Sequence, residues 1–133
     1  MAAESRDGAP RVLHLHSTFA AGGKELRSVQ LINAFGSKLA HAIVSADPNA
    51  YGAAEHIAKG RDVIYPRNFP SLSGKPWPKR LRALAAAMKQ YDLVLTYNWG
   101  AMDAVMAHTL FKDAMRLPPL VHHEDGFNED EQD

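Results

Sequence analysis

Polar residues that could do chemistry gather in three short segments, each of which follows an apolar run. Residues 16–24 contain a glycine pair, residues 97–100 are Tyr-Asn-Trp-Gly, and residues 122–126 are His-His-Glu-Asp-Gly. Glycines let a backbone approach an anion closely, and a helix that starts after them offers free N–H groups and partial positive charge. Imidazoles and carboxylates can exchange protons with a substrate hydroxyl. The three segments together indicate an anion site beside a proton-transferring group.

The glycine segment leads from an apolar run into a helical segment. Gly22, Gly23 and the following Lys24 could let backbone amides meet a diphosphate, or they could form an ordinary turn. His14 and His16 alternate onto one face of the preceding strand. We expect His14 to be a core residue with its hydrogen bonds satisfied. We expect His16, which is nearer the strand end, to touch a ligand.

The other two segments offer a ring and a proton acceptor. Asn98 and Trp99 follow an apolar run, and the indole could stack on a sugar or pack against the next helix. His122 and His123 must point to opposite faces while the strand continues. Beyond the strand end, residues 124–125 (Glu-Asp) could turn either carboxylate inward and take a proton from a hydroxyl.

A metal site is the weaker interpretation of these histidines. It would need His16, His123 and a carboxylate as shared ligands. In the sheet expected below, their strands are two spacings apart, roughly 9–10 Å, which is far for one ion. We therefore expect no metal.

The elements that must position these residues alternate along the chain. Short apolar runs predict strands at 12–16, 42–46, 62–65, Leu93–Tyr97 and Leu120–His123, and the segments between them predict helices at 25–35, 53–59, 79–90 and Met102–Met115. Gly36 should end the first helix and Gly60 the second. This alternation predicts an α/β, Rossmann-like three-layer sandwich with a parallel sheet in the order 3-2-1-4-5. Ligands bind such sheets at the carboxyl edge where the winding reverses, which here lies between strands one and four. All three polar segments follow strands at this edge, so we expect them to lie close together there.

Two helices carry apolar stripes at helical spacing. Leu81, Leu84, Ala85 and Met88 form one stripe, and Met102, Val105, Met106, Thr109 and Leu110 form the other. The stretch 66–78 between the third strand and the next helix has four prolines, which predicts a long loop that is functional or mobile. Basic residues at its end, Lys75, Lys79, Arg80 and Arg82, predict a solvated face, or alternatively a peripheral contact with anionic lipid.

The composition of the chain excludes some classes of protein. The 133 residues suit one domain, and 15 basic residues balance 15 acidic ones, which gives no field that favours nucleic acid. The chain has no cysteine and no apolar run of membrane-spanning length, so we expect a cytoplasmic protein. We divide it into a flexible lead-in (1–10), the α/β domain (11–127) and an acidic tail (128–133). Because the tail follows the fifth strand directly, we expect a piece of a longer protein.

The residues in the predicted strands and the glycine loop resemble a known family. Residues 11–17, 19–25 (Phe-Ala-Ala-Gly-Gly-Lys-Glu), 92–98 and 120–126 resemble the N-terminal domain of family-4 (group 1) retaining glycosyltransferases of the GT-B fold. The resemblance spans about residues 11–127. Its most specific element is the Gly-Gly-x-Glu pattern at residues 22–25, which opens the first helix.

The resemblance implies one half of a two-domain enzyme. It implies that this half holds the acceptor, a glycan or lipid-linked hydroxyl, and that a C-terminal domain holds the nucleotide-sugar without a metal or other cofactor. The glycine loop (Gly22, Gly23, Lys24) would lie against the donor diphosphate. The family often has a histidine after the fifth strand, where Asp125 falls here; a shift of one or two residues would place His123 there. Glu124 lies between these two candidates, and His16, Asn98, Trp99 and Gly126 are expected on the acceptor side.

Two alternatives stay open from the residues alone. One is a dinucleotide-binding oxidoreductase domain in which Asp47, after the second strand, holds a ribose; the chain lacks the Gly-x-Gly-x-x-Gly spacing of that class. The other is a non-catalytic α/β binding module. On the glycosyltransferase interpretation, this chain alone should not turn over, since most donor contacts belong to the other domain.

Overall fold

The computed structural model describes residues 9–16, 18–19, 23–47, 49–72, 75, 77–97 and 102–123. The elements in chain order are β1 (Arg11–His16), α1 (Gly23–Phe35), the 3-10 helix η2 (Gly36–Lys38), β2 (Ala40–Ser45), the 3-10 helix η3 (Gly52–His56), β3 (Asp62–Ile64), α2 (Pro78–Met88), β4 (Leu93–Tyr97), α3 (Met102–Met115) and β5 (Leu120–His123).

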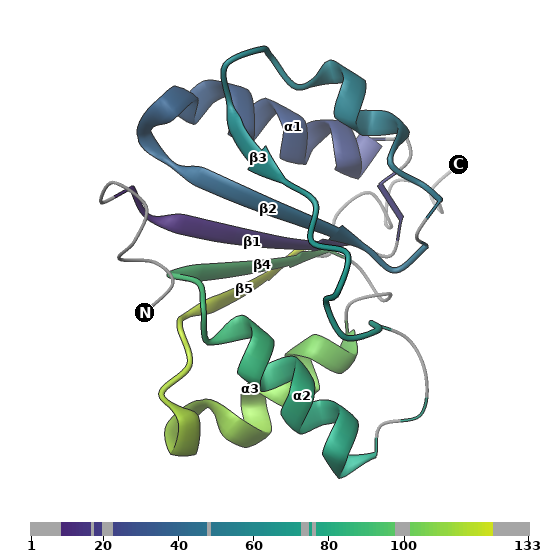
Figure 1. Cartoon of the computed structure of the whole chain (residues 1–133), viewed down its shortest axis with the longest axis vertical. Helices are drawn as coiled ribbons and strands as arrows, with labels where there is room; N and C mark the ends of the chain where they lie inside the picture. Colours follow the sequence, from purple (N-terminus) through teal and green to yellow (C-terminus); the bar gives the residue numbers. More distant parts are fainter. Residues whose placement is uncertain are drawn as a thin grey trace, which may run out of the picture.

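The five strands form one parallel sheet in the order β3-β2-β1-β4-β5, which confirms the predicted α/β class and strand order. Helix α1 lies on one face, and α2 and α3 lie on the other (Figure 1). Helix α1, the sheet, and the pair α2 and α3 form the three layers of a Rossmann-like sandwich. The direction of winding reverses between β1 and β4, as expected from the order.

The sheet separates two hydrophobic clusters. On the face of α2 and α3, Leu13 and Leu15 of β1 pack with Leu84 and Val94. On the face of α1, the buried members are Phe19, Val29, Ile32, Ile43 and Ala53. Because successive strand residues point to opposite faces, β1 turns its leucines to one cluster and its histidines to the other.

Helix α2 uses the stripe that the sequence predicts. Leu81, Leu84, Ala85 and Met88 are all buried. The helix begins at Pro78, a favoured first position because proline has no N–H to leave unpaired. The predicted bounds, 79–90, differ from the observed ones only at the ends.

The predicted stripe of α3 is wrong. Ala104 and Ala107 are its buried residues, whereas Met106 and Leu110 keep 42% and 62% of their surface exposed. This helix has apolar residues on several faces, so spacing alone could not select the buried one. The face with small alanines turns inward, which lets α3 pack closely against α2 and the sheet.

The second predicted helix, 53–59, is also corrected. The chain forms the short η3 helix at Gly52–His56 instead, and Gly60, with φ of 87°, lies in a turn four residues beyond it. Gly36, with φ of 61°, ends α1 as predicted, since it adopts the left-handed conformation that glycine tolerates best.

Arg80 is not part of a solvated basic face. Its guanidinium pairs with Asp103 at 2.6 Å and donates a hydrogen bond to the Ser71 carbonyl at 2.8 Å. It therefore ties α2 to α3 and to the proline-rich loop. The loop is also docked by Leu72, which is 3% exposed in the core, a contact that the prediction of a mobile loop did not foresee.

Candidate functional site

Three aromatic rings stack at the carboxyl edge of the sheet, at the point where the winding reverses. His16 of β1, Tyr97 of β4 and His123 of β5 lie in register across the three strands. The His16 and Tyr97 ring centroids are 4.1 Å apart with planes 4° from parallel, and those of Tyr97 and His123 are 4.8 Å apart at 12°. We call these three residues the ring stack. Tyr97 separates the two imidazoles, so they cannot share a ligand in the way a metal would need.

A second layer of polar side chains lies behind the ring stack, beginning with His14, which is two residues before His16 on β1. His14 Nε2 is 2.9 Å from His41 Nδ1, and His14 Nδ1 lies 3.2 Å from the Tyr97 hydroxyl and 3.4 Å from Ser28 Oγ. His14 is 1% exposed, so the expectation of a satisfied core histidine is confirmed. The contact with Ser28 of α1 shows that this network occupies the α1 face of the sheet.

The second layer disfavours positive charge. Burial lowers the pKa of His14 well below 6.5, and the charges of His41, His16 and His123 act in the same direction. Burial also lowers the pKa of His41, against an opposing effect of Asp62. These two imidazoles are therefore neutral at pH 7, and they support the ring stack by hydrogen bonding rather than by charge.

The two predicted histidines at the end of β5 point to opposite faces, as expected. His122 Nδ1 lies 2.7 Å from Thr96 Oγ1, whereas His123 stacks on Tyr97. His123 is half-buried, and its Nδ1 is buried without a hydrogen-bond partner among the described residues. An imidazole held in one orientation with spare hydrogen-bonding capacity suits proton transfer or ligand binding.

His16 has a packing role in addition to its predicted contact with ligand. Its ring is 1% exposed and packs against Phe19 as well as Tyr97. Phe19 is fixed in turn, because its N–H donates to the Ala50 carbonyl and its carbonyl accepts from the Ala53 N–H, at 2.9 and 2.8 Å. The segments after β1 and β2 are thereby joined at the carboxyl edge. Binding by His16 stays a prediction.

The glycine loop is described only from its last glycine. Gly23 begins α1, as expected for a loop that opens a helix. Glu25, the last residue of the Gly-Gly-x-Glu pattern, is 3% exposed in the first turn of α1, where a carboxylate interacts favourably with the helix dipole. A phosphate bound at this helix would share its N-terminus with Glu25.

Several predicted site residues lie outside the described part of the structure. They are Gly22, the side chain of Lys24, Asn98, Trp99, Glu124, Asp125 and Gly126. Their roles stay predictions.

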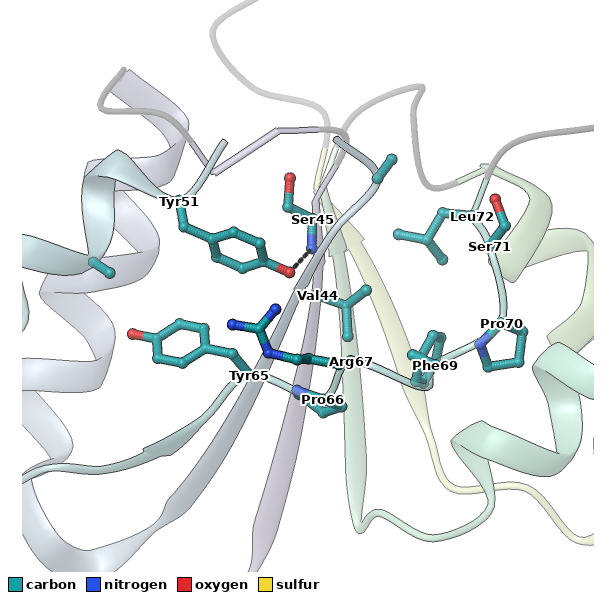
Figure 2. A pocket seen from close by; sticks show the side chains of 12 residues that line it. Val44, Ser45, Tyr51, Tyr65, Pro66, Arg67, Phe69, Pro70, Ser71 and Leu72 are labelled. Carbon is teal, nitrogen blue, oxygen red and sulfur yellow. Dashed lines mark hydrogen bonds between the residues drawn. The ribbon is translucent and has the colours of Figure 1, made fainter. Parts of the chain in front are cut away.

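A cavity of about 500 Å³ lies at the carboxyl end of β2, the strand that pairs with β1 (Figure 2). The described residues that line it are Val44, Ser45, Ala46, Tyr51, Ala54, Tyr65, Pro66, Arg67, Phe69, Pro70, Ser71 and Leu72. We call it the β2 cavity. This cavity was not predicted from the sequence, although the aromatic residues that follow the second and third predicted strands were a usable signal.

Within the described residues, no group of three or more histidines, aspartates, glutamates or cysteines is placed to hold a metal ion. A helix that combines enough length and apolarity to cross the bilayer is also not found in that part of the chain. Comparison with models of protein families, with curated proteins and with solved structures found no match for this chain.

Proposed function

We propose that this chain is the acceptor-side domain of a retaining glycosyltransferase that moves a sugar from a nucleotide-sugar to an acceptor hydroxyl. The observation that supports this proposal best is the ring stack, which lies at the carboxyl edge between β1, β4 and β5. Open parallel sheets bind their ligands at this place, where the winding reverses. The resemblance at residues 11–127 supplies the class of reaction.

In this proposal, His123 lies at the reacting sugar. Stacking on Tyr97 fixes the plane of its imidazole, and the hydrogen bond between the Tyr97 hydroxyl and His14 Nδ1 holds the tyrosine in turn. A positioned imidazole can hydrogen-bond to the reacting sugar or exchange a proton with a hydroxyl. The rest of the rate would come from stabilising the leaving diphosphate and from orienting donor and acceptor across a cleft with a second domain.

The oxidoreductase alternative finds less support at Asp47. Its carboxylate accepts a hydrogen bond from the Asn49 N–H at 3.0 Å, and its N–H donates to Ser45 Oγ at 3.2 Å. These bonds form a local turn after β2, a common use of aspartate. A ribose would have to compete with this turn for the carboxylate.

Titration calorimetry on the 133-residue chain tests the proposal against this alternative. We expect uridine and guanosine diphosphate sugars to bind more weakly than micromolar, because most donor contacts belong to the other domain. A micromolar Kd for a nucleotide-sugar would contradict the two-domain proposal. Tight binding of a nicotinamide dinucleotide would support the oxidoreductase instead.

A further inference from the structure

The β2 cavity opens on the same edge of the sheet as the ring stack and is joined to it by the backbone. The Ala46 N–H, on the cavity lining, donates a hydrogen bond of 2.8 Å to the His16 carbonyl. The volume of about 500 Å³ falls within the range of roughly 300–1,000 Å³ that is usual for small-molecule sites. A molecule in this cavity would therefore lie on the same edge of the sheet as the proposed reaction centre, with β1 and β4 between β2 and the strand that carries His123.

One wall of the β2 cavity is built from two tyrosine rings. Tyr51 and Tyr65 meet edge to face, with centroids 5.4 Å apart and planes at 86°. The Tyr51 hydroxyl accepts a hydrogen bond from the Ser45 N–H at 2.9 Å, which fixes this ring against the end of β2 (Figure 2). Burial raises the pKa of Tyr65, and Tyr51 adds to the effect, so the Tyr65 phenol stays neutral.

The opposite wall is mostly apolar. Phe69, Pro70 and Leu72 lie across from the tyrosines in Figure 2, with Val44 of β2 between the two groups. Leu72 is buried in the core cluster, and Phe69 packs against that cluster. Apolar walls that include aromatic rings suit a cyclic ligand, because a ring can pack flat against them.

Arg67 gives the β2 cavity its charge. Among the lining residues that the structure describes, it alone is charged, and no described side chain or carbonyl pairs with its guanidinium. The guanidinium lies on the side of the tyrosines (Figure 2). Arginine recognises phosphate and carboxylate groups through paired N–H donors. An exposed arginine that has no partner among the described residues and lies beside aromatic rings favours an anionic ligand.

We propose that the β2 cavity binds a phosphorylated sugar, with the sugar ring against Tyr51 and Tyr65 and the phosphate on Arg67. The identification of this sugar as the acceptor rests on the proposed glycosyltransferase function. The binding itself does not depend on it, because it involves this chain alone.

The test is a nuclear magnetic resonance titration of the 133-residue chain. The probes are glucose 1-phosphate, glucose 6-phosphate, mannose 6-phosphate and N-acetylglucosamine 6-phosphate, compared with glucose, inorganic phosphate and adenosine monophosphate. We expect at least one sugar phosphate to shift the amides of Ser45, Tyr51, Tyr65 and Arg67, and to bind about tenfold or more tightly than glucose or phosphate. No shift with any sugar phosphate at 10 mM, or equal binding of inorganic phosphate, would overturn the proposal. Tighter binding of adenosine monophosphate would overturn the assignment to a sugar.

Two matched variants locate the phosphate. Arg67→Gln removes an exposed charge in the β2 cavity, and Arg82→Gln removes an exposed charge on α2 outside it. We expect Arg67→Gln to weaken binding about tenfold, the scale of one lost charge-assisted contact, and Arg82→Gln to leave it unchanged. Equal effects would indicate nonspecific attraction and contradict the proposal. If a sugar phosphate binds in the β2 cavity but the longer enzyme has no transferase activity, only the proposed function is refuted. If the longer enzyme transfers a sugar to neutral sugars and no sugar phosphate binds in the β2 cavity, only this inference is refuted.

Discussion

Acid should destabilise this protein through the histidine pair behind the ring stack. His14 is buried and neutral in the folded state because its pKa lies well below 6.5, whereas in the unfolded chain it titrates near 6.5. A lowered folded pKa means that the unfolded state binds more protons below pH 6.5. The stability contributed by neutral His14 is therefore complete above that pH and is lost as the pH falls toward the folded pKa.

The size of the loss follows from linkage. While His14 stays unprotonated in the folded state, each pH unit below 6.5 lowers the free energy of unfolding by at most about 1.4 kcal/mol. His41 acts in the same direction, because burial lowers its pKa too, with Asp62 opposing. Since total stabilities are commonly about 5–15 kcal/mol, the effect is large enough to measure.

Urea unfolding at pH 8, 6.5 and 5 tests this reasoning on the wild type and three variants. His14→Gln should be less stable at pH 8, since glutamine cannot match the contacts to His41, Tyr97 and Ser28, but its stability should fall less steeply with pH. His41→Gln provides the same test in case His14→Gln does not fold, and it should also make the fall in stability with pH less steep. His56→Gln, at an exposed histidine, should keep the wild-type slope. An unchanged slope in both His14→Gln and His41→Gln would refute the account.

Leu84→Ala should lower the free energy of unfolding in urea by about 2–5 kcal/mol, because Leu84 is fully buried. Leu110→Ala should change it by no more than about 0.5 kcal/mol, because Leu110 is exposed. Similar losses in both variants would contradict the assignment of the core. Gly36→Ala should cost about 1–2 kcal/mol through backbone strain alone, since φ is 61° and an added Cβ would meet no atom within 4 Å beyond its own residue and its two chain neighbours. An unchanged melting temperature would show that the turn adjusts. In a double-mutant cycle, Arg80→Ala and Asp103→Ala should couple by about 0.5–3 kcal/mol, as expected for contacting residues. Additive losses would mean that the ion pair contributes nothing.

The sequence predicted the sheet well because its strands are short, apolar and separated by helices. The observed bounds of β4, α3 and β5 equal the predicted ones, and the strand order follows from right-handed crossovers in a doubly wound sheet. The buried face of α3 could not be predicted, since residues such as Met106 and Ala107 compete for the same core, and close packing decides between them.

The candidate site was predicted only in part. His16 and His123 were predicted at the same edge of the sheet, on strands two spacings apart, but Tyr97 was not recognised as the ring between them, because that depends on the register of three strands. The β2 cavity was missed for a similar reason. Tyr51 and Arg67 come from segments that follow different strands, and only the fold brings them to one cavity.

The central claim is tested most directly by sugar transfer in a longer polypeptide that carries both this domain and the nucleotide-sugar domain that the proposal expects. The assay compares His123→Ala, on the face of the ring stack, with His122→Ala, on the opposite face of β5. The account predicts that His123→Ala lowers turnover by roughly 10²–10⁴-fold with a melting temperature close to that of the parent, while His122→Ala keeps most of the turnover. Normal turnover by a normally folded His123→Ala variant would contradict the account.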